Sequence, residues 1–351
     1  MGRVVLVTGV AAPLGARAAR RLVDDPGIER VVGVDVLPPR DDLGDVRFVR
    51  ADIRNPVIAK VLAVEDVDTV VHMSVVAGAG RAGGLAAVKE TNVIGTMQLL
   101  AACQRSSTVG NLVLKSSTAV YGASAHDPGL FVEDMPPRQL PLSGYAKDSA
   151  EVESYVRGFA RRRPDVAVTV LRWADVLGAG IDSHDSQLGQ YFRLPLVPTV
   201  LGFDPRLQLL HPDDGLAAVH QAVVVMRPGT YNVAGPGVLT LSQILRRLGR
   251  ATVPVPAQGV GTVGQALRRA SDLELSSDQV ALLTHGRVVD TTALRDRFGY
   301  EPRWSTAATL EDFAEATGRG PLDARRIRSV EQRLVAAYAA ARGPRGGTHD
   351  A

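Results

Sequence analysis

The beginning of the chain constrains its fold most strongly, because a β-branched run, a glycine-bearing turn and a helix-like stretch follow one another there. RVVLVTG (residues 3–9) is typical of a buried strand, and PLGARAARRLVDD (13–25) starts with a proline at a first-turn position, which suits a helix. The alternation continues, with further strands expected at 31–35, 47–52, 68–74, 111–117 and 166–172 and helices at about 56–64, 85–105 and 145–163. Near-continuous apolar strands between helices indicate a parallel sheet covered on both faces.

The first turn, TGVAAPLG (8–15), has the features of a dinucleotide-binding turn. Gly9 and Gly15 allow a tight turn and close helix packing, although Ala12 replaces the middle glycine, and the helix N-terminus offers free N–H groups to a pyrophosphate. Asp35 follows at the end of the second strand, where a carboxylate binds ribose hydroxyls and repels a 2′-phosphate. The pattern favours a Rossmann doubly wound sheet that binds NAD; the alternative is a chance strand–turn–helix with a solvent-facing Asp35.

The composition changes after residue 173, where Gly- and Pro-rich loops separate short segments. Here we expect helices at about 213–226 and 241–249 and a short strand at 230–233. We therefore predict an α/β fold with a smaller C-terminal α/β domain. The predicted parts are an NAD-binding Rossmann domain (1–173), a substrate-binding region that partly returns to the sheet (174–320), a C-terminal helix (321–341) and a disordered tail (342–351).

Bulk properties exclude several classes of protein. The net charge of +3 gives no reason to expect a nucleic-acid groove. Cys103 is the single cysteine, so no intrachain disulfide can form, which suits a reducing compartment. Without an apolar run of roughly 18 residues we expect no membrane span and a cytoplasmic location. The seven histidines are scattered and no H-E-x-x-H pattern occurs, so we expect no metal site.

Further motifs, in the same order along the chain, resemble those of the extended short-chain dehydrogenase/reductase family, in particular its NAD-dependent epimerase/dehydratase branch. That branch includes UDP-glucose 4-epimerases and sugar-nucleotide dehydratases. The matching segments are ADI (51–53), VVHMS (70–74), TNVIGTMQLLAAC (91–103), KSSTAVYG (115–122), FVEDMPPRQLPLSGYAKDS (131–149), LRWADVLGAG (171–180), RLQLLHPDDGLAAV (206–219), GTYNVAG (229–235) and LRDRFGYEPRW (294–304).

The resemblance implies sites as well as a fold. It places cofactor contacts at Gly9, Ala12, Leu14, Gly15, Asp35, Asp52, Ile53, His72, Asn92, Tyr145 and Ser149. It places substrate contacts at Ser117, Asp175, Arg206 and Arg287. It further implies a nucleotide-sugar substrate and a homodimer formed through the helices at 85–105 and 145–163.

The catalytic unit implied by the resemblance is a Ser or Thr, a Tyr and a Lys four residues after the Tyr. Ser117 and Tyr145 match the first two positions, but Ser149 stands where the lysine should be. A phenol has a pKa of about 10, so it needs a nearby cation to act as a base near neutral pH. Lys147 cannot supply that cation, because position i+2 of a helix is rotated by about 200° from Tyr145.

Lys115 offers a replacement cation. It precedes Ser117 by two residues on the same expected strand, so both side chains project from one face. Our hypothesis is that Lys115 supplies the missing charge to Tyr145. The alternative is a structural lysine paired with an acid or with backbone carbonyls.

The substrate half departs from the family pattern at Asp175, where relatives often have Asn. A carboxylate there would repel a nucleotide diphosphate, which Arg206 and Arg287 would otherwise hold; the alternative for both arginines is a surface role. The sequence thus favours an NAD-dependent epimerase/dehydratase-type enzyme acting on a nucleotide sugar or related polyol. Two alternatives stay open: an NAD(H)-binding regulatory or structural protein without catalysis, and a one-way NAD-dependent dehydrogenase or reductase.

Overall fold

The fold is taken from a computed structural model, which describes residues 2–75, 89–135, 144–181, 186–256 and 276–320. The helix predicted at 321–341 and the tail at 342–351 lie outside these residues, as does the start of the helix predicted from residue 85. Among the described helices, none combines the length and the apolar character that crossing a membrane requires.

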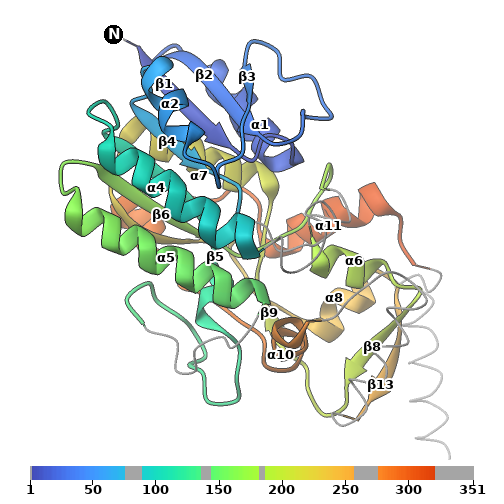
Figure 1. The fold of residues 1–351 in the computed structure, drawn as a ribbon. Helices are drawn as coiled ribbons and strands as arrows, with labels where there is room; N and C mark the ends of the chain where they lie inside the picture. Colours follow the sequence, from blue (N-terminus) through green and yellow to red (C-terminus); the bar gives the residue numbers. More distant parts are fainter. Residues whose placement is uncertain (1, 76–88, 136–143, 182–185, 257–275, 321–351) are drawn as a thin grey trace, which may run out of the picture.

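A seven-stranded sheet forms the centre of the molecule (Figure 1), in the order β11-β6-β5-β4-β1-β2-β3. Every neighbouring pair in it is parallel, as predicted. Its strands are β1 (Arg3–Thr8), β2 (Ile28–Asp35), β3 (Arg47–Arg50), β4 (Thr69–His72), β5 (Asn111–Ser117), β6 (Ala167–Trp173) and β11 (Gly229–Val233). The predicted Rossmann-type α/β fold is therefore confirmed.

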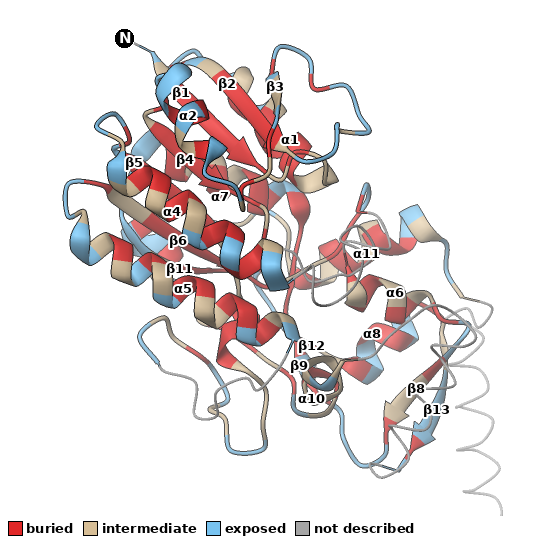
Figure 2. Cartoon of the chain, viewed as in Figure 1, coloured by how far each residue is buried: buried red, intermediate tan, exposed pale blue. Residues whose placement is uncertain are grey.

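Helices cover both faces of this sheet because the strands are apolar on both sides. One face packs against α2 (Val57–Val64), α4 (Gly95–Arg105) and α5 (Gly144–Arg162). The opposite face packs against α1 (Pro13–Val23) and α7 (Pro212–Val225). A π-helical turn, η2 (Glu90–Ile94), leads directly into α4. Figure 2 shows the central strands buried between these two layers.

The second half of the chain builds a smaller cluster at one end of the sheet (Figure 1). It contains the parallel pair β8 (Leu196–Val200) and β13 (Ala251–Val255) and the short strands β7 (Asp175–Val176), β9 (Arg206–Leu207), β10 (Leu209–Leu210) and β12 (Leu239–Thr240). Its helices are α6 (Gln187–Arg193), α8 (Leu241–Arg247), α10 (Ser277–His285) and α11 (Thr306–Thr317), with a π-helical turn η5 (Leu294–Phe298). Apolar side chains from residues 177–314, most of them leucine or aromatic, form a separate core there.

Three expected segments of this half appear close to their predicted positions, namely α7, β11 and α8. The sequence pattern did not predict α6, α10, α11 or the β8–β13 pair. β11 lies beside β6 at the edge of the large sheet. The exact division at residue 173 stays a prediction.

Candidate functional site

The crevice at the carboxyl ends of the strands begins at the turn after β1. The sheet order reverses between β1 and β4, and such a switch point is where α/β sheets bind ligands. Gly9 has a φ of +82°, which favours glycine, and a Cβ on Gly15 would lie only 2.1 Å from the Gly9 carbonyl oxygen. Ala12 precedes α1 without a side-chain cap and Leu14 is half-buried, so the first N–H groups of α1 remain available to an anion.

Asp35 lies beside this turn at the end of β2. Its carboxylate accepts hydrogen bonds from the backbone N–H of Ala11 at 3.0 Å and of Val36 at 2.7 Å. These bonds hold the carboxylate against the turn. A cavity of about 120 Å³ lies beside the same turn and is lined by Val10, Ala11, Pro13, Ala16, Arg40, Asp41 and Gly180. The predicted phosphate turn and the predicted ribose-binding carboxylate are therefore neighbours.

Two other predicted cofactor contacts already have partners in the protein. The Arg54 guanidinium donates to Asp52 at 2.7 Å and lowers the pKa of that carboxyl. The ring nitrogens of His72 bond to Thr8 at 2.8 Å and Thr96 at 2.9 Å. Burial lowers the pKa of His72 from 6.5 to about 4, so its imidazole is neutral near pH 7.

The next predicted contacts are also buried. Ile53 is 5% exposed and approaches Gly95, whose added Cβ would lie 2.8 Å from the Ile53 side chain. Asn92, in η2, donates its side-chain amide to Asp148 of α5 at 3.3 Å. Burial raises the pKa of Asp148, against the effect of that hydrogen bond. Asn92 therefore ties the π-helical turn to the tyrosine helix, a role that the sequence did not indicate.

Lys115 of β5 approaches Tyr145 of α5, and Ser117 lies two residues farther along β5. The Lys115 Nζ donates to the carbonyl oxygen of Val75 at 3.1 Å and lies 3.5 Å from the Tyr145 hydroxyl, a long hydrogen bond. Ser117 accepts from the backbone N–H of Ala119 at 3.1 Å. The geometry therefore contains features of both sequence interpretations of Lys115, because this ammonium contacts a backbone carbonyl and the phenol at once.

Position 149 is the place that a lysine would occupy in the family pattern. Ser149 is 1% exposed, and its Oγ has no hydrogen-bond partner among the described residues. A buried hydroxyl without a partner points to a contact that the protein alone does not supply. Lys147 is exposed, in agreement with the helical rotation expected from the sequence.

Two of the predicted substrate residues, Arg287 and Asp175, form an ion pair that the sequence did not predict. Arg287 donates from Nε to Thr118 Oγ1 at 3.1 Å and from Nη1 to the Gly122 carbonyl at 3.2 Å, and its Nη2 lies 3.5 Å from an Asp175 carboxylate oxygen. Burial raises the pKa of Asp175 and lowers the pKa of Arg287, so each charge depends on the other. The backbone carbonyl of Arg206 accepts from the N–H of Arg287 at 3.0 Å, but the exposed Arg206 side chain donates to the carbonyl of Gly129 at 3.1 Å.

Asp278, at the start of α10, is a site residue that the sequence analysis missed. It accepts a hydrogen bond from the backbone N–H of Ala146 in the first turn of the tyrosine helix, where a negative charge is favourable. Its Oδ2 would lie 2.9 Å from a Cβ on Gly144 and has no hydrogen-bond partner within the described ranges. Burial raises the pKa of this carboxyl. No local motif marks Asp278, because its partner is more than a hundred residues away.

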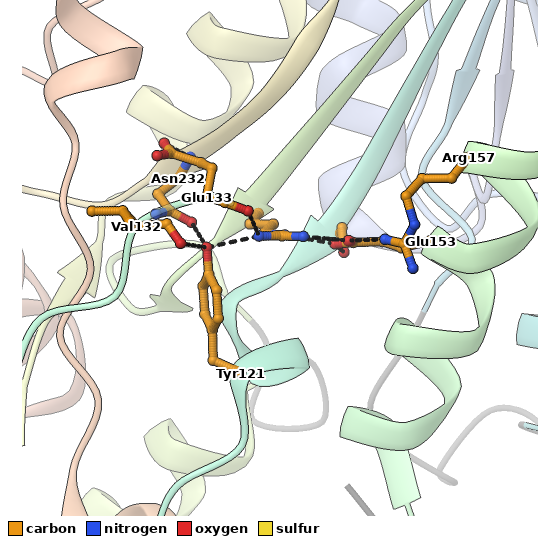
Figure 3. A network of polar contacts seen from close by, with 8 residues as sticks. Tyr121, Val132, Glu133, Glu153, Arg157 and Asn232 are labelled. Carbon is orange, nitrogen blue, oxygen red and sulfur yellow. Dashed lines mark hydrogen bonds and ion pairs between the residues drawn. The ribbon is translucent and has the colours of Figure 1, made fainter. Parts of the chain in front are cut away.

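A buried polar network connects the tyrosine helix α5 to the sheet (Figure 3). Arg172 of β6 forms a salt bridge with Glu153 of α5 at 2.7 Å and donates to the Tyr121 hydroxyl at 2.7 Å. Ser116 donates to Glu153 at 2.6 Å, and Tyr121 donates to Asn232 at 2.8 Å. These bonds tie α5 to β5, β6 and β11, so they hold the tyrosine helix in register with the strand that carries Lys115 and Ser117.

Comparisons with known proteins match this architecture. The family model described as "NAD dependent epimerase/dehydratase family" matches residues 5–234, more than half of the chain. The chain belongs to the NAD-dependent epimerase/dehydratase family. The family resemblance seen in the sequence is thus confirmed, and NAD is the cofactor of this epimerase/dehydratase family member.

Relatives and solved structures extend the comparison. An uncharacterized protein of Mycobacterium tuberculosis is 48% identical over 339 residues, covering 95% of this chain and 89% of the relative. A probable UDP-arabinose 4-epimerase of Oryza sativa is 31% identical over 189 residues, covering 50% of this chain and 45% of its own.

Two solved structures share the fold of this family member. The UDP-glucose 4-epimerase of Thermotoga maritima, solved with UDP-glucose, has a TM-score of 0.69 at 21% identity and covers 89% of this chain and 98% of its own. The UDP-glucuronic acid 4-epimerase of Bacillus cereus, solved with UDP-glucuronic acid and NAD, has a TM-score of 0.66 at 18% identity. The match covers 90% of this chain and 98% of that epimerase. At these identities the likeness concerns the fold alone.

Proposed function

We propose that this protein catalyses hydride transfer between bound NAD and a secondary alcohol of a nucleotide sugar or related polyol, in the manner of an epimerase. The observation that carries the proposal is the contact of 3.5 Å between the Lys115 ammonium and the Tyr145 hydroxyl, two residues before Ser117 on β5. This arrangement supplies a cation, an acid/base and a hydrogen-bond donor at one crevice, although the helix lacks the lysine at position 149.

The residues of the crevice fit NAD. Neither Gly9 nor Gly15 has room for a side chain, and the turn that they bound presents the α1 N-terminus to a pyrophosphate. Asp35 would hold the adenosine ribose, and the unpartnered Ser149 Oγ would meet a hydroxyl of the second ribose. When bound, NAD supplies an acceptor for the hydride that leaves the substrate carbon.

The side chains at the end of β5 would perform the proton transfer. Tyr145 as phenolate takes the proton of the substrate hydroxyl as its carbon loses hydride, and returns that proton in the reverse direction. Lys115, held by the Val75 carbonyl, stabilises the phenolate by its positive charge. Arg287, which is paired with Asp175, also interacts electrostatically with Tyr145. Ser117 orients the reacting oxygen by a hydrogen bond.

A second candidate is an NAD(H)-binding regulatory or structural protein without catalysis, favoured by the serine at position 149. Incubating the NAD-loaded protein with UDP-glucose, UDP-galactose and a panel of polyols separates the candidates. The readouts are sugar interconversion and absorbance at the NADH band. Interconversion without net NADH supports the epimerase, and net NADH indicates a one-way dehydrogenase. If no compound of the panel reacts while NAD stays bound, the result would favour the NAD(H)-binding protein without catalysis. Tyr145→Phe is the control that should abolish either reaction while NAD binding persists.

Assembly and location complete the proposal. We propose a homodimer through α4 and α5 and action in the cytoplasm. Ile94 is 44% exposed and Met97 41% exposed at the start of this helix pair, so such a dimer would cover apolar surface. Sedimentation analysis should show a dimer that Met97→Glu dissociates; an unchanged dimer would exclude this interface.

A further inference from the structure

The guanidinium of Arg287 is already engaged by the protein. Each of its three nitrogens has a protein partner, namely Thr118, the Gly122 carbonyl and Asp175. Its side chain is only 8% exposed, whereas that of Asp175 is 31% exposed. A molecule entering the crevice therefore meets the carboxylate of this pair before it meets the guanidinium.

The neighbourhood of the pair adds further negative charge. Asp278 and Asp127 both interact electrostatically with Arg287, and Asp278 Oδ2 has no hydrogen-bond partner among the described side chains and backbone. Arg206, the other arginine of this region, is exposed and donates a hydrogen bond to the Gly129 carbonyl rather than to Asp175. A diphosphate placed here would have to displace Asp175 from Arg287 and would leave that half-buried carboxylate beside a like charge.

We propose that Asp175 determines the substrate class of this site, by neutralising Arg287 and offering a hydrogen-bond acceptor in its place. The substrate would present hydroxyl groups to Asp175: a polyol or glycoside without a nucleoside diphosphate. In this respect the protein differs from its structural neighbours, which were solved with UDP-glucose and UDP-glucuronic acid. The inference rests on the proposed function, because it takes hydride transfer as the reaction. It concerns only the group attached to the reacting polyol or sugar, which we infer is not a nucleoside diphosphate.

The test is calorimetric titration of UDP into the NAD-loaded wild type and into Asp175→Asn. The amide keeps the shape of the side chain but removes its charge, which releases Arg287 for charge-assisted bonds to phosphate. We expect UDP to bind Asp175→Asn at least about tenfold more tightly than the wild type, since such bonds contribute about 1.5–3 kcal/mol. A gain of binding cannot arise from a variant that fails to fold.

Asp165→Asn is the matched control. It removes the same charge from another arginine pair, Arg163–Asp165 at 2.7 Å, which lies before β6, whereas Asp175 follows the other end of that strand. UDP affinity of this variant should equal that of the wild type. Equal affinity of wild type and Asp175→Asn, or an equal gain in Asp165→Asn, would overturn the proposal. Because the titration needs no turnover, its result is independent of whether the panel assay detects hydride transfer.

Discussion

Replacing Lys115 with methionine removes the cation beside the phenol and keeps the length of the side chain. At 3.5 Å and an effective dielectric constant of about 20, an ammonium stabilises a phenolate by about 5 kcal/mol. With about half of the proton transferred in the transition state, the loss amounts to about 2–3 kcal/mol. We therefore expect hydride transfer in a single turnover to slow about 30- to 150-fold.

The assay follows absorbance at the NADH band after rapid mixing of the NAD-loaded protein with an alcohol that the panel identifies. Lys147→Met is the matched control, because Lys147 is an exposed lysine only two residues from Tyr145. Its rate should stay within about twofold of the wild type, since an exposed charge is screened by solvent. Unchanged turnover in Lys115→Met, with NAD binding and thermal midpoint retained, would refute the electrostatic role of Lys115.

Three other predictions concern the surroundings of the site. Arg172→Met removes the buried guanidinium that pairs with Glu153 at 2.7 Å and should lower the free energy of unfolding in urea by about 3–5 kcal/mol. Arg157→Met removes only the 58% exposed partner and should lower it by less than about 1 kcal/mol; equal losses would contradict this ranking. Gly15→Ala forces a Cβ to within 2.1 Å of a backbone oxygen, so we expect a loss of about 1–3 kcal/mol in stability and weaker NAD binding by calorimetry. Retained NAD affinity would show that the turn can relax. Burial lowers the pKa of His72 from 6.5 to about 4, so this imidazole is protonated at a lower pH in the folded protein than in the unfolded chain. The free energy of unfolding should therefore drop by about 3 kcal/mol as the pH falls from 6.5 to about 4, and His72→Gln should show a smaller drop. Identical plots of unfolding free energy against pH for the two proteins would contradict the assignment.

The parallel sheet could be predicted because each of its strands is a local signal. Runs such as Val4–Val7 are too apolar for a surface, and the spacing between runs leaves room for one crossover helix each. The cluster formed by α6, α10 and α11 was missed because its segments contribute to a separate apolar core rather than to the core of the large sheet. Their stability comes from contacts far apart in sequence, which no local pattern records.

The site was predictable only as far as the geometry of single elements reaches. Strand periodicity placed Lys115 and Ser117 on one face, and helix periodicity excluded Lys147. Neither periodicity could show that Lys115 approaches Tyr145 to 3.5 Å, since β5 and α5 meet only in the folded sheet. The pairing of Asp175 with Arg287 likewise depends on how the second half returns to the first.

The central claim is that Lys115 takes over the charge that the family pattern assigns to the helix position four residues after Tyr145. The most direct test is the turnover of the double variant Lys115→Met/Ser149→Lys, which moves the lysine back to the helix. If Lys115 acts through its charge, the double variant should recover most of the activity that Lys115→Met loses. A double variant that folds and binds NAD but stays as slow as Lys115→Met would contradict the account.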